Sequence, residues 1–87
     1  MIAGRLPPHN LEAEESLLGA MLLSRDAIRA AVEVVTPGDF YRPAYGGVYA
    51  AILRLWGDGH PVDPVTVAGE LHRAAALDDL GGRKAIL

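Results

Sequence analysis

Apolar residues recur along this chain at the three- and four-residue spacing of one helix face. In the first such segment Leu11, Leu18 and Leu22 fall at offsets of 0, 7 and 11, as a helix buried on one side requires. Asn10 stands just before the segment, and asparagine is a favoured N-cap because its side-chain oxygen accepts from a free backbone N–H. The pattern predicts a helix that begins after Asn10 and ends near Leu23.

A second apolar stripe follows almost at once. Its members lie at i, i+3, i+4 and i+7 and are Ile28, Ala31, Val32 and Val35. Ser24 is the expected N-cap, so the link is short and the two helices must contact each other. Thr36-Pro37-Gly38-Asp39 ends this helix, because proline is tolerated only in a first turn. We expect a short helical turn there, running through Tyr41.

Pro43 opens a third predicted helix, whose largely apolar surface places it at the centre of the core. Gly57-Asp58-Gly59-His60-Pro61 ends it, since glycine accepts the left-handed conformation that follows many helices. Asp63 as N-cap and Pro64 as first residue start a fourth helix. The apolar side of the fourth helix consists of Val67, Ala68, Leu71 and Ala75.

The two ends of the chain carry signals other than a complete helix. Leu77–Gly82 is predicted to be a turn, and Arg83–Leu87 the opening of a fifth helix. Residues 1–10 contain Pro7-Pro8. The two prolines fix two φ angles and lack the backbone N–H groups that a helix would use as hydrogen-bond donors, so an extended N-terminal arm is expected there. Residues 11–87 then form the helical domain.

No segment alternates apolar and polar residues as a strand would, and Val62–Val67 is interrupted by Pro64. The sequence therefore predicts an all-α fold. Because the connections are a few residues each, the expected architecture is a compact orthogonal bundle of about four to five short helices.

Six signals in this order resemble the N-terminal domain of the DnaB-type replicative DNA helicases of bacteria, from about Pro7 to Gly82. They are Pro7-Pro8, the acidic helix start with Glu12, Glu14 and Glu15, Asp39-Phe40-Tyr41, Arg42-Pro43, the glycine loop closed by Asp63, and Leu77-Asp78-Asp79-Leu80-Gly81-Gly82. The resemblance implies a non-catalytic collar domain that serves ring assembly and primase recruitment during DNA replication. Its implied partners are primase and other copies of the helicase, with DNA reached only through the full-length ring.

The same resemblance implies that ATP and Mg belong to a separate C-terminal motor domain of the parent protein, and that a pairing helical hairpin lies beyond Leu87. Three places depart from the family pattern, and one of them is Arg83-Lys84-Ala85-Ile86-Leu87, which lacks the aromatic residue expected after the Gly-Gly pair. Gly46-Gly47 stands where polar helix formers are usual, and each interior glycine costs about 1 kcal/mol, so the third helix is expected to fray at its start. Ala75 replaces a helix-ending glycine, so the fourth helix is expected to run further or end less sharply.

Composition and charge argue against several classes of function. The formal net charge of −3 disfavours a free-standing nucleic-acid binder. Cysteine is absent, which excludes disulfides and thiolate chemistry. The longest apolar run, Leu17–Leu23, is far too short to span a bilayer, and Met1–Leu6 lacks the apolar core of a secretory leader. We expect a bacterial cytoplasmic protein without membrane contact.

No residue pattern predicts catalysis, a cofactor or a metal in this chain. There is no Gly-x-x-x-x-Gly-Lys-Ser/Thr loop to wrap a phosphate. His9, His60 and His72 occur singly, without a second histidine at i+4 to share a metal. Ser16 and Ser24 have no evident base.

The candidate partner surface therefore consists of aromatic and cationic residues: Tyr41, Arg42, Tyr45 and Tyr49. Aromatic residues and arginine are favoured in interfaces, although a stripe of Tyr45, Tyr49 and Trp56 is also typical of a core. Phe40 is expected to be a core anchor, and Arg42 a local partner of Asp39.

Two alternatives stay open at this point. One is a small helical DNA-binding or regulatory module that imitates a helix-turn-helix. Arg25 and Arg29 share a face of the second helix, but the third carries only Arg54. The other is a stand-alone relative without a motor domain.

Overall fold

The computed structural model describes the backbone of residues 10–84 and the side chains of residues 10–77. In chain order its elements are α1 (Leu11–Leu23), α2 (Arg25–Val32), the 3₁₀ turn η1 (Pro37–Asp39), α3 (Pro43–Gly57) and α4 (Pro64–Lys84). No strand occurs within residues 10–84, so the predicted all-α fold is confirmed. Of the arm expected over residues 1–10, residues 1–9 lie outside this range, and Asn10 caps α1.

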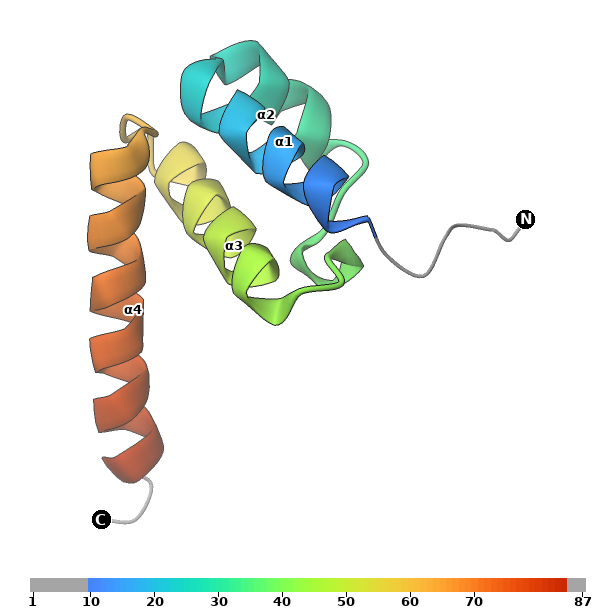
Figure 1. The fold of residues 1–87 in the computed structure, drawn as a ribbon. Coiled ribbons are helices and arrows are strands. Elements are labelled where there is room, and N and C mark those ends of the chain that lie inside the picture. Colours follow the sequence, from blue (N-terminus) through green and yellow to red (C-terminus); the bar gives the residue numbers. More distant parts are fainter. Residues whose placement is uncertain (1–9, 85–87) are drawn as a thin grey trace.

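Both predicted caps at the start of the chain are confirmed. The backbone N–H of Ala13 donates to Oδ1 of Asn10 at 3.0 Å, and that of Ala27 donates to Oγ of Ser24 at 3.3 Å. Ser24 alone separates α1 from α2, and the two helices lie side by side (Figure 1). A one-residue link thus forces the contact that the sequence predicted.

The core gathers around α3, which lies between the α1–α2 pair and α4 (Figure 1). Tyr49, Ala51 and Ile52 of α3 have no exposed surface. The residues from the other elements that are buried with them are Leu18, Met21, Ile28, Ala31, Phe40 and Val67. The central position predicted for α3 is therefore confirmed, although Val32 of the predicted α2 stripe is 37% exposed.

The connection from α3 to α4 uses the expected glycine and aspartate. Gly59 has a φ of +75°, a conformation in which glycine carries no steric cost, and the N–H of His60 reaches back to the carbonyl of Leu55 at 2.9 Å. At the start of α4, the N–H of Thr66 donates to Oδ1 of Asp63 at 2.8 Å, while the N–H of Asp63 donates to Oγ1 of Thr66 at 2.9 Å. This reciprocal pair fixes where α4 begins.

The turn predicted at Leu77–Gly82 is wrong, because α4 continues through it to Lys84. Alanine and leucine are strong helix formers, and Ala74-Ala75-Ala76-Leu77 enters that segment without a proline or a helix-ending glycine. The longer fourth helix expected from Ala75 is thus confirmed. Arg83 and Lys84 belong to α4 rather than to a fifth helix, and residues 85–87 lie outside the described residues.

The fraying expected at Gly46-Gly47 is also wrong, since α3 is helical from Pro43. Gly46 is buried, and a Cβ built on it would lie 2.7 Å from the carbonyl oxygen of Pro37. This glycine lets the first turns of α3 pack directly against the backbone of η1, so its small size outweighs its poor helix propensity.

Candidate partner surface

Two glutamates of α1 hold the segment that leads into α3. Oε2 of Glu14 accepts from the backbone N–H of Tyr41 at 2.8 Å, and Oε2 of Glu15 accepts from the hydroxyl of Tyr45 at 2.5 Å. The sequence indicated only that these acids suit a helix start. The structure shows that they also position two of the four candidate residues.

Arg42 lies against Tyr45 rather than Asp39. The centre of its guanidinium is 5.2 Å from the centroid of the Tyr45 ring, within cation–π range. Asp39 instead accepts from the backbone N–H of Thr36 at 2.8 Å, so the expected pairing of Arg42 with Asp39 is wrong. We call Tyr41, Arg42 and Tyr45 the tyrosine–arginine surface.

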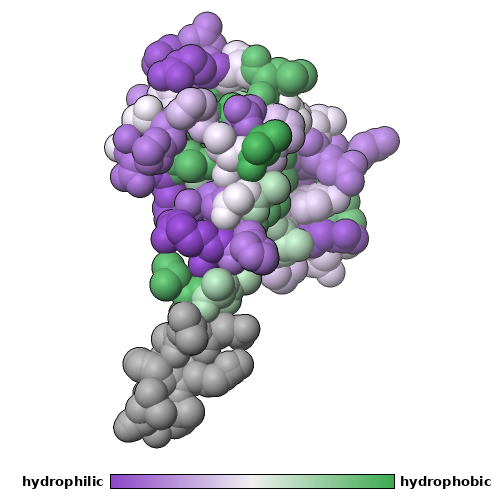
Figure 2. Space-filling model, turned by 90° about the vertical axis from the view of Figure 1, so that its left-hand side faces the viewer, coloured by the Kyte–Doolittle hydropathy of each residue, from purple (hydrophilic) through white to green (hydrophobic). Residues whose placement is uncertain are grey.

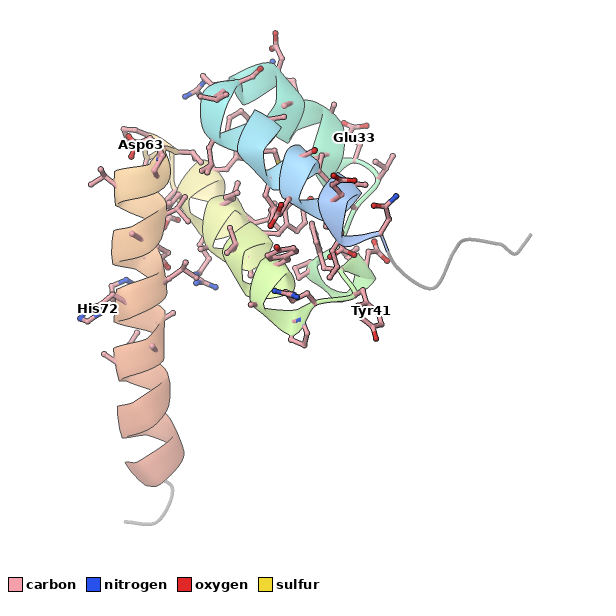
Figure 3. The ribbon with its side chains drawn as sticks, in the orientation of Figure 1. Glu33, Tyr41, Asp63 and His72 are labelled. Atoms are coloured by element: carbon pink, nitrogen blue, oxygen red, sulfur yellow. The ribbon has the colours of Figure 1, made fainter. Side chains whose placement is uncertain are left out.

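The tyrosine–arginine surface is solvent-accessible and partly fixed in place. Tyr41 is 57% exposed and lies beside η1 (Figure 3), and Arg42 is exposed beside the half-buried Tyr45. The hydrogen bond to Glu15 raises the pKa of Tyr45, because an ionised phenol would face a carboxylate. Tyr45 therefore remains a neutral hydrogen-bond donor at physiological pH.

Tyr49 does not belong to this surface, and its assignment there from the sequence is wrong. It is completely buried, its ring centroid is 5.3 Å from that of Phe40, and its hydroxyl donates to the carbonyl of Val35 at 2.8 Å. Burial also raises the pKa of Tyr49. The core role expected for Phe40, which is 8% exposed, is confirmed.

A second charged cluster joins α3 to α4. The carboxylate of Glu70 is 8% exposed and accepts from Nε of Arg54 at 2.5 Å and from Arg73 at 2.6 Å. The hydrogen bonds from Arg73 and Arg54 lower the pKa of Glu70. Arg54 is the one cationic residue of α3, so a helix-turn-helix interpretation would need it to contact DNA. In the structure it is already paired with Glu70.

The remaining described surface offers no evident reactive centre. No group of three or more His, Cys, Asp or Glu side chains that could hold a metal occurs among the described residues. His72 projects from the outer side of α4, on the far side of that helix from α3 (Figure 3). His9 lies outside the described range. No helix in that range is long and apolar enough to cross a bilayer.

Exposed apolar side chains are scattered on the α4 side of the molecule. Figure 2 shows hydrophobic surface there, interrupted by hydrophilic surface. Val65 is 80% exposed near the start of α4, and Leu77 is 53% exposed further along it. The distribution does not single out one apolar groove on that side.

Comparison with known proteins agrees with this geometry. Residues 6–87 match the family described as "DnaB-like helicase N terminal domain". The chain is 57% identical over 79 residues to the "Replicative DNA helicase DnaB" of Mycobacterium leprae, covering 91% of this chain and 13% of that protein. It is 45% identical over 82 residues to the "Replicative DNA helicase DnaC" of Bacillus subtilis, covering 94% of this chain and 18% of that protein.

The fold is similar to a solved structure as well. The crystal structure of the N-terminal domain of DnaB helicase from Mycobacterium tuberculosis superposes with a TM-score of 0.77 at 56% identity. The similarity covers 87% of this chain and 55% of the solved one. The chain thus spans less than a fifth of the length of the two curated relatives named above.

Proposed function

Because the chain belongs to the DnaB-like helicase N-terminal domain family, we propose that it is the non-catalytic N-terminal domain of a replicative DNA helicase. In this role it contributes to assembly of the helicase ring with other copies and recruits primase. ATP, Mg and DNA are handled by the rest of the parent protein. The family match over residues 6–87 is the observation that carries the proposal.

The tyrosine–arginine surface supports a role in partner binding. Aromatic residues and arginine are enriched in interfaces and carry much of their binding free energy. Tyr41 and Tyr45 are held by Glu14 and Glu15 before any partner arrives. A preformed surface loses less conformational entropy on binding, so the two glutamates favour association without touching the partner.

Sedimentation velocity tests both parts of the role. It is applied to this chain, and to a longer version that carries the next segment of the parent protein, each alone and mixed with the C-terminal domain of primase. The proposal expects a faster-sedimenting species in at least one mixture with primase, and self-association of the longer version. If neither version self-associates nor binds primase, the proposed function is wrong.

A further inference from the structure

Two arginines of α2 converge on one aromatic ring at the corner where α1 meets α2. The guanidinium centre of Arg25 lies 5.0 Å from the ring centroid of Trp56, and that of Arg29 lies 5.8 Å from it. Trp56 is half-buried and packs against the core from the end of α3. The ring thus holds two exposed cations one helical turn apart.

The positive charge at this corner is only partly neutralised. Arg29 pairs with Asp26 at 2.7 Å. No carboxylate of the described part of the chain forms an ion pair with Arg25. Arg25 lies in the first turn of α2, where a positive charge opposes the helix dipole, so helix stability does not account for its presence.

We propose that Arg25, Arg29 and Trp56 bind an acidic segment of a partner protein, with carboxylates one helical turn apart. Carboxylates at i and i+4 on a helix are spaced as Arg25 and Arg29 are, and guanidinium groups bind carboxylates in a bidentate geometry. Stacking on Trp56 limits the freedom of both cations, which reduces the entropy lost on binding. Leu23, 88% exposed at the same corner, offers an apolar contact beside the charges.

Protein carboxylates suit this corner better than nucleic-acid phosphates. A phosphate backbone presents a continuous line of negative charge, which would meet Asp26 and Glu33 on or next to α2 and the formal net charge of −3 on the chain. An acidic protein segment presents a few separate carboxylates. It can therefore contact Arg25 and Arg29 and leave Asp26 in water.

This corner is distinct from the tyrosine–arginine surface. Glu14 and Glu15 lie in the first turns of α1, whereas the corner follows its last residue, Leu23. The thirteen residues of α1 extend about 20 Å at 1.5 Å per residue. The inference therefore does not depend on the proposed function, and each can fail separately.

Trp56 provides the readout, because it is the one tryptophan in the chain. The probes are two short, blocked, alanine-based helical peptides with one leucine, one carrying two glutamates at i and i+4 and the other carrying glutamines there. We expect saturable changes in Trp56 fluorescence with the glutamate peptide. The glutamine peptide cannot form the two exposed charge pairs. It should therefore bind about tenfold more weakly than the glutamate peptide at low salt.

Variants of this corner give the matched controls. Arg25→Gln with Arg29→Gln should weaken binding of the glutamate peptide about tenfold, whereas Asp26→Asn, which releases Arg29, should strengthen it. Circular dichroism checks that each variant remains helical. Equal binding of both peptides, no fluorescence change up to millimolar peptide, or a duplex DNA oligonucleotide that binds more tightly through the same two arginines would overturn the inference.

Discussion

The hydroxyl of Tyr49 donates a hydrogen bond to the backbone carbonyl of Val35 at 2.8 Å. Tyr49 is wholly buried in the middle of α3, whereas Val35 follows the end of α2. The bond therefore ties the link between α2 and η1 to the central helix. The bond is partly buried, so leaving the Val35 carbonyl without a donor adds a desolvation cost to the loss of the bond itself.

Replacing Tyr49 with phenylalanine should lower the free energy of unfolding by about 1–2 kcal/mol, because the ring is kept and only the donor to Val35 is lost. Urea unfolding followed by circular dichroism measures the change. Tyr45→Phe is the control, since its hydroxyl bonds to Glu15 at the surface, where water can replace the lost donor and the cost should be smaller than at Tyr49. Equal losses in the two variants would contradict this account of Tyr49.

Alanine substitutions at the two neighbouring glycines of α3 should change the stability of the protein in opposite directions. At Gly46 a Cβ would lie 2.7 Å from the carbonyl oxygen of Pro37, and a backbone atom cannot move aside easily. Overpacking of this kind costs about 1–3 kcal/mol, so Gly46→Ala should be destabilising. A Cβ built on Gly47 would meet no atom within 4 Å outside its chain neighbours and the backbone of its own helix, so Gly47→Ala should stabilise α3 by up to about 1 kcal/mol.

Thermal unfolding of the two single variants, compared with that of the unsubstituted 87-residue chain, measures both effects. The pair is informative because both substitutions raise helix propensity equally. They differ only in the room that is available for the added Cβ. An increase in Tm for Gly46→Ala would show that α3 does not pack against η1 as described.

Glu70 should make stability depend on pH. Its pKa is lowered in the folded protein by Arg73 and Arg54 from its ordinary value of 4.5. Because a lowered pKa means that the unfolded chain takes up the proton first, the stabilisation is complete above about pH 4.5 and is lost as pH falls through the folded-state pKa.

Glu70→Gln should therefore be less stable than the unsubstituted chain at pH 7, and the difference should shrink as the pH falls below about 4.5. Denaturant unfolding at several pH values measures it. Glu12→Gln is the matched control, because Glu12 is exposed and forms no hydrogen bond or ion pair to another described residue. A difference for Glu70→Gln that stays constant with pH would rule out the proposed ionic role.

The helix starts could be predicted because their signals are local. Asn10, Ser24 and Asp63 each bond to a backbone N–H three residues ahead, so residue type and position suffice to identify them. The end of α4 was harder to predict, because glycines weaken a helix without always ending it. There the alanine-rich approach through Ala74-Ala75-Ala76 decided the outcome.

The contacts that build the surfaces could not be predicted in the same way. Glu14 reaches Tyr41 across 27 positions, and Arg54 reaches Glu70 across 16. Such pairs leave no periodic pattern, because they depend on how the helices cross. The same limit explains Tyr49, whose residue type suits a surface as well as a core, and only the packing of α3 decides between them.

The central claim is that this chain is a partner-binding domain whose tyrosine–arginine surface recruits primase. Isothermal titration calorimetry with the C-terminal domain of primase tests it most directly, using the parent chain, the double variant Tyr41→Ala with Arg42→Ala, and Val65→Ala as an exposed control on α4. The account predicts saturable binding by the parent chain and Val65→Ala, and at least about tenfold weaker binding by the double variant, as for an interface hot spot. Binding that is absent both from this chain and from the longer version that carries the next segment of the parent protein, or that is unchanged in the double variant, would contradict it.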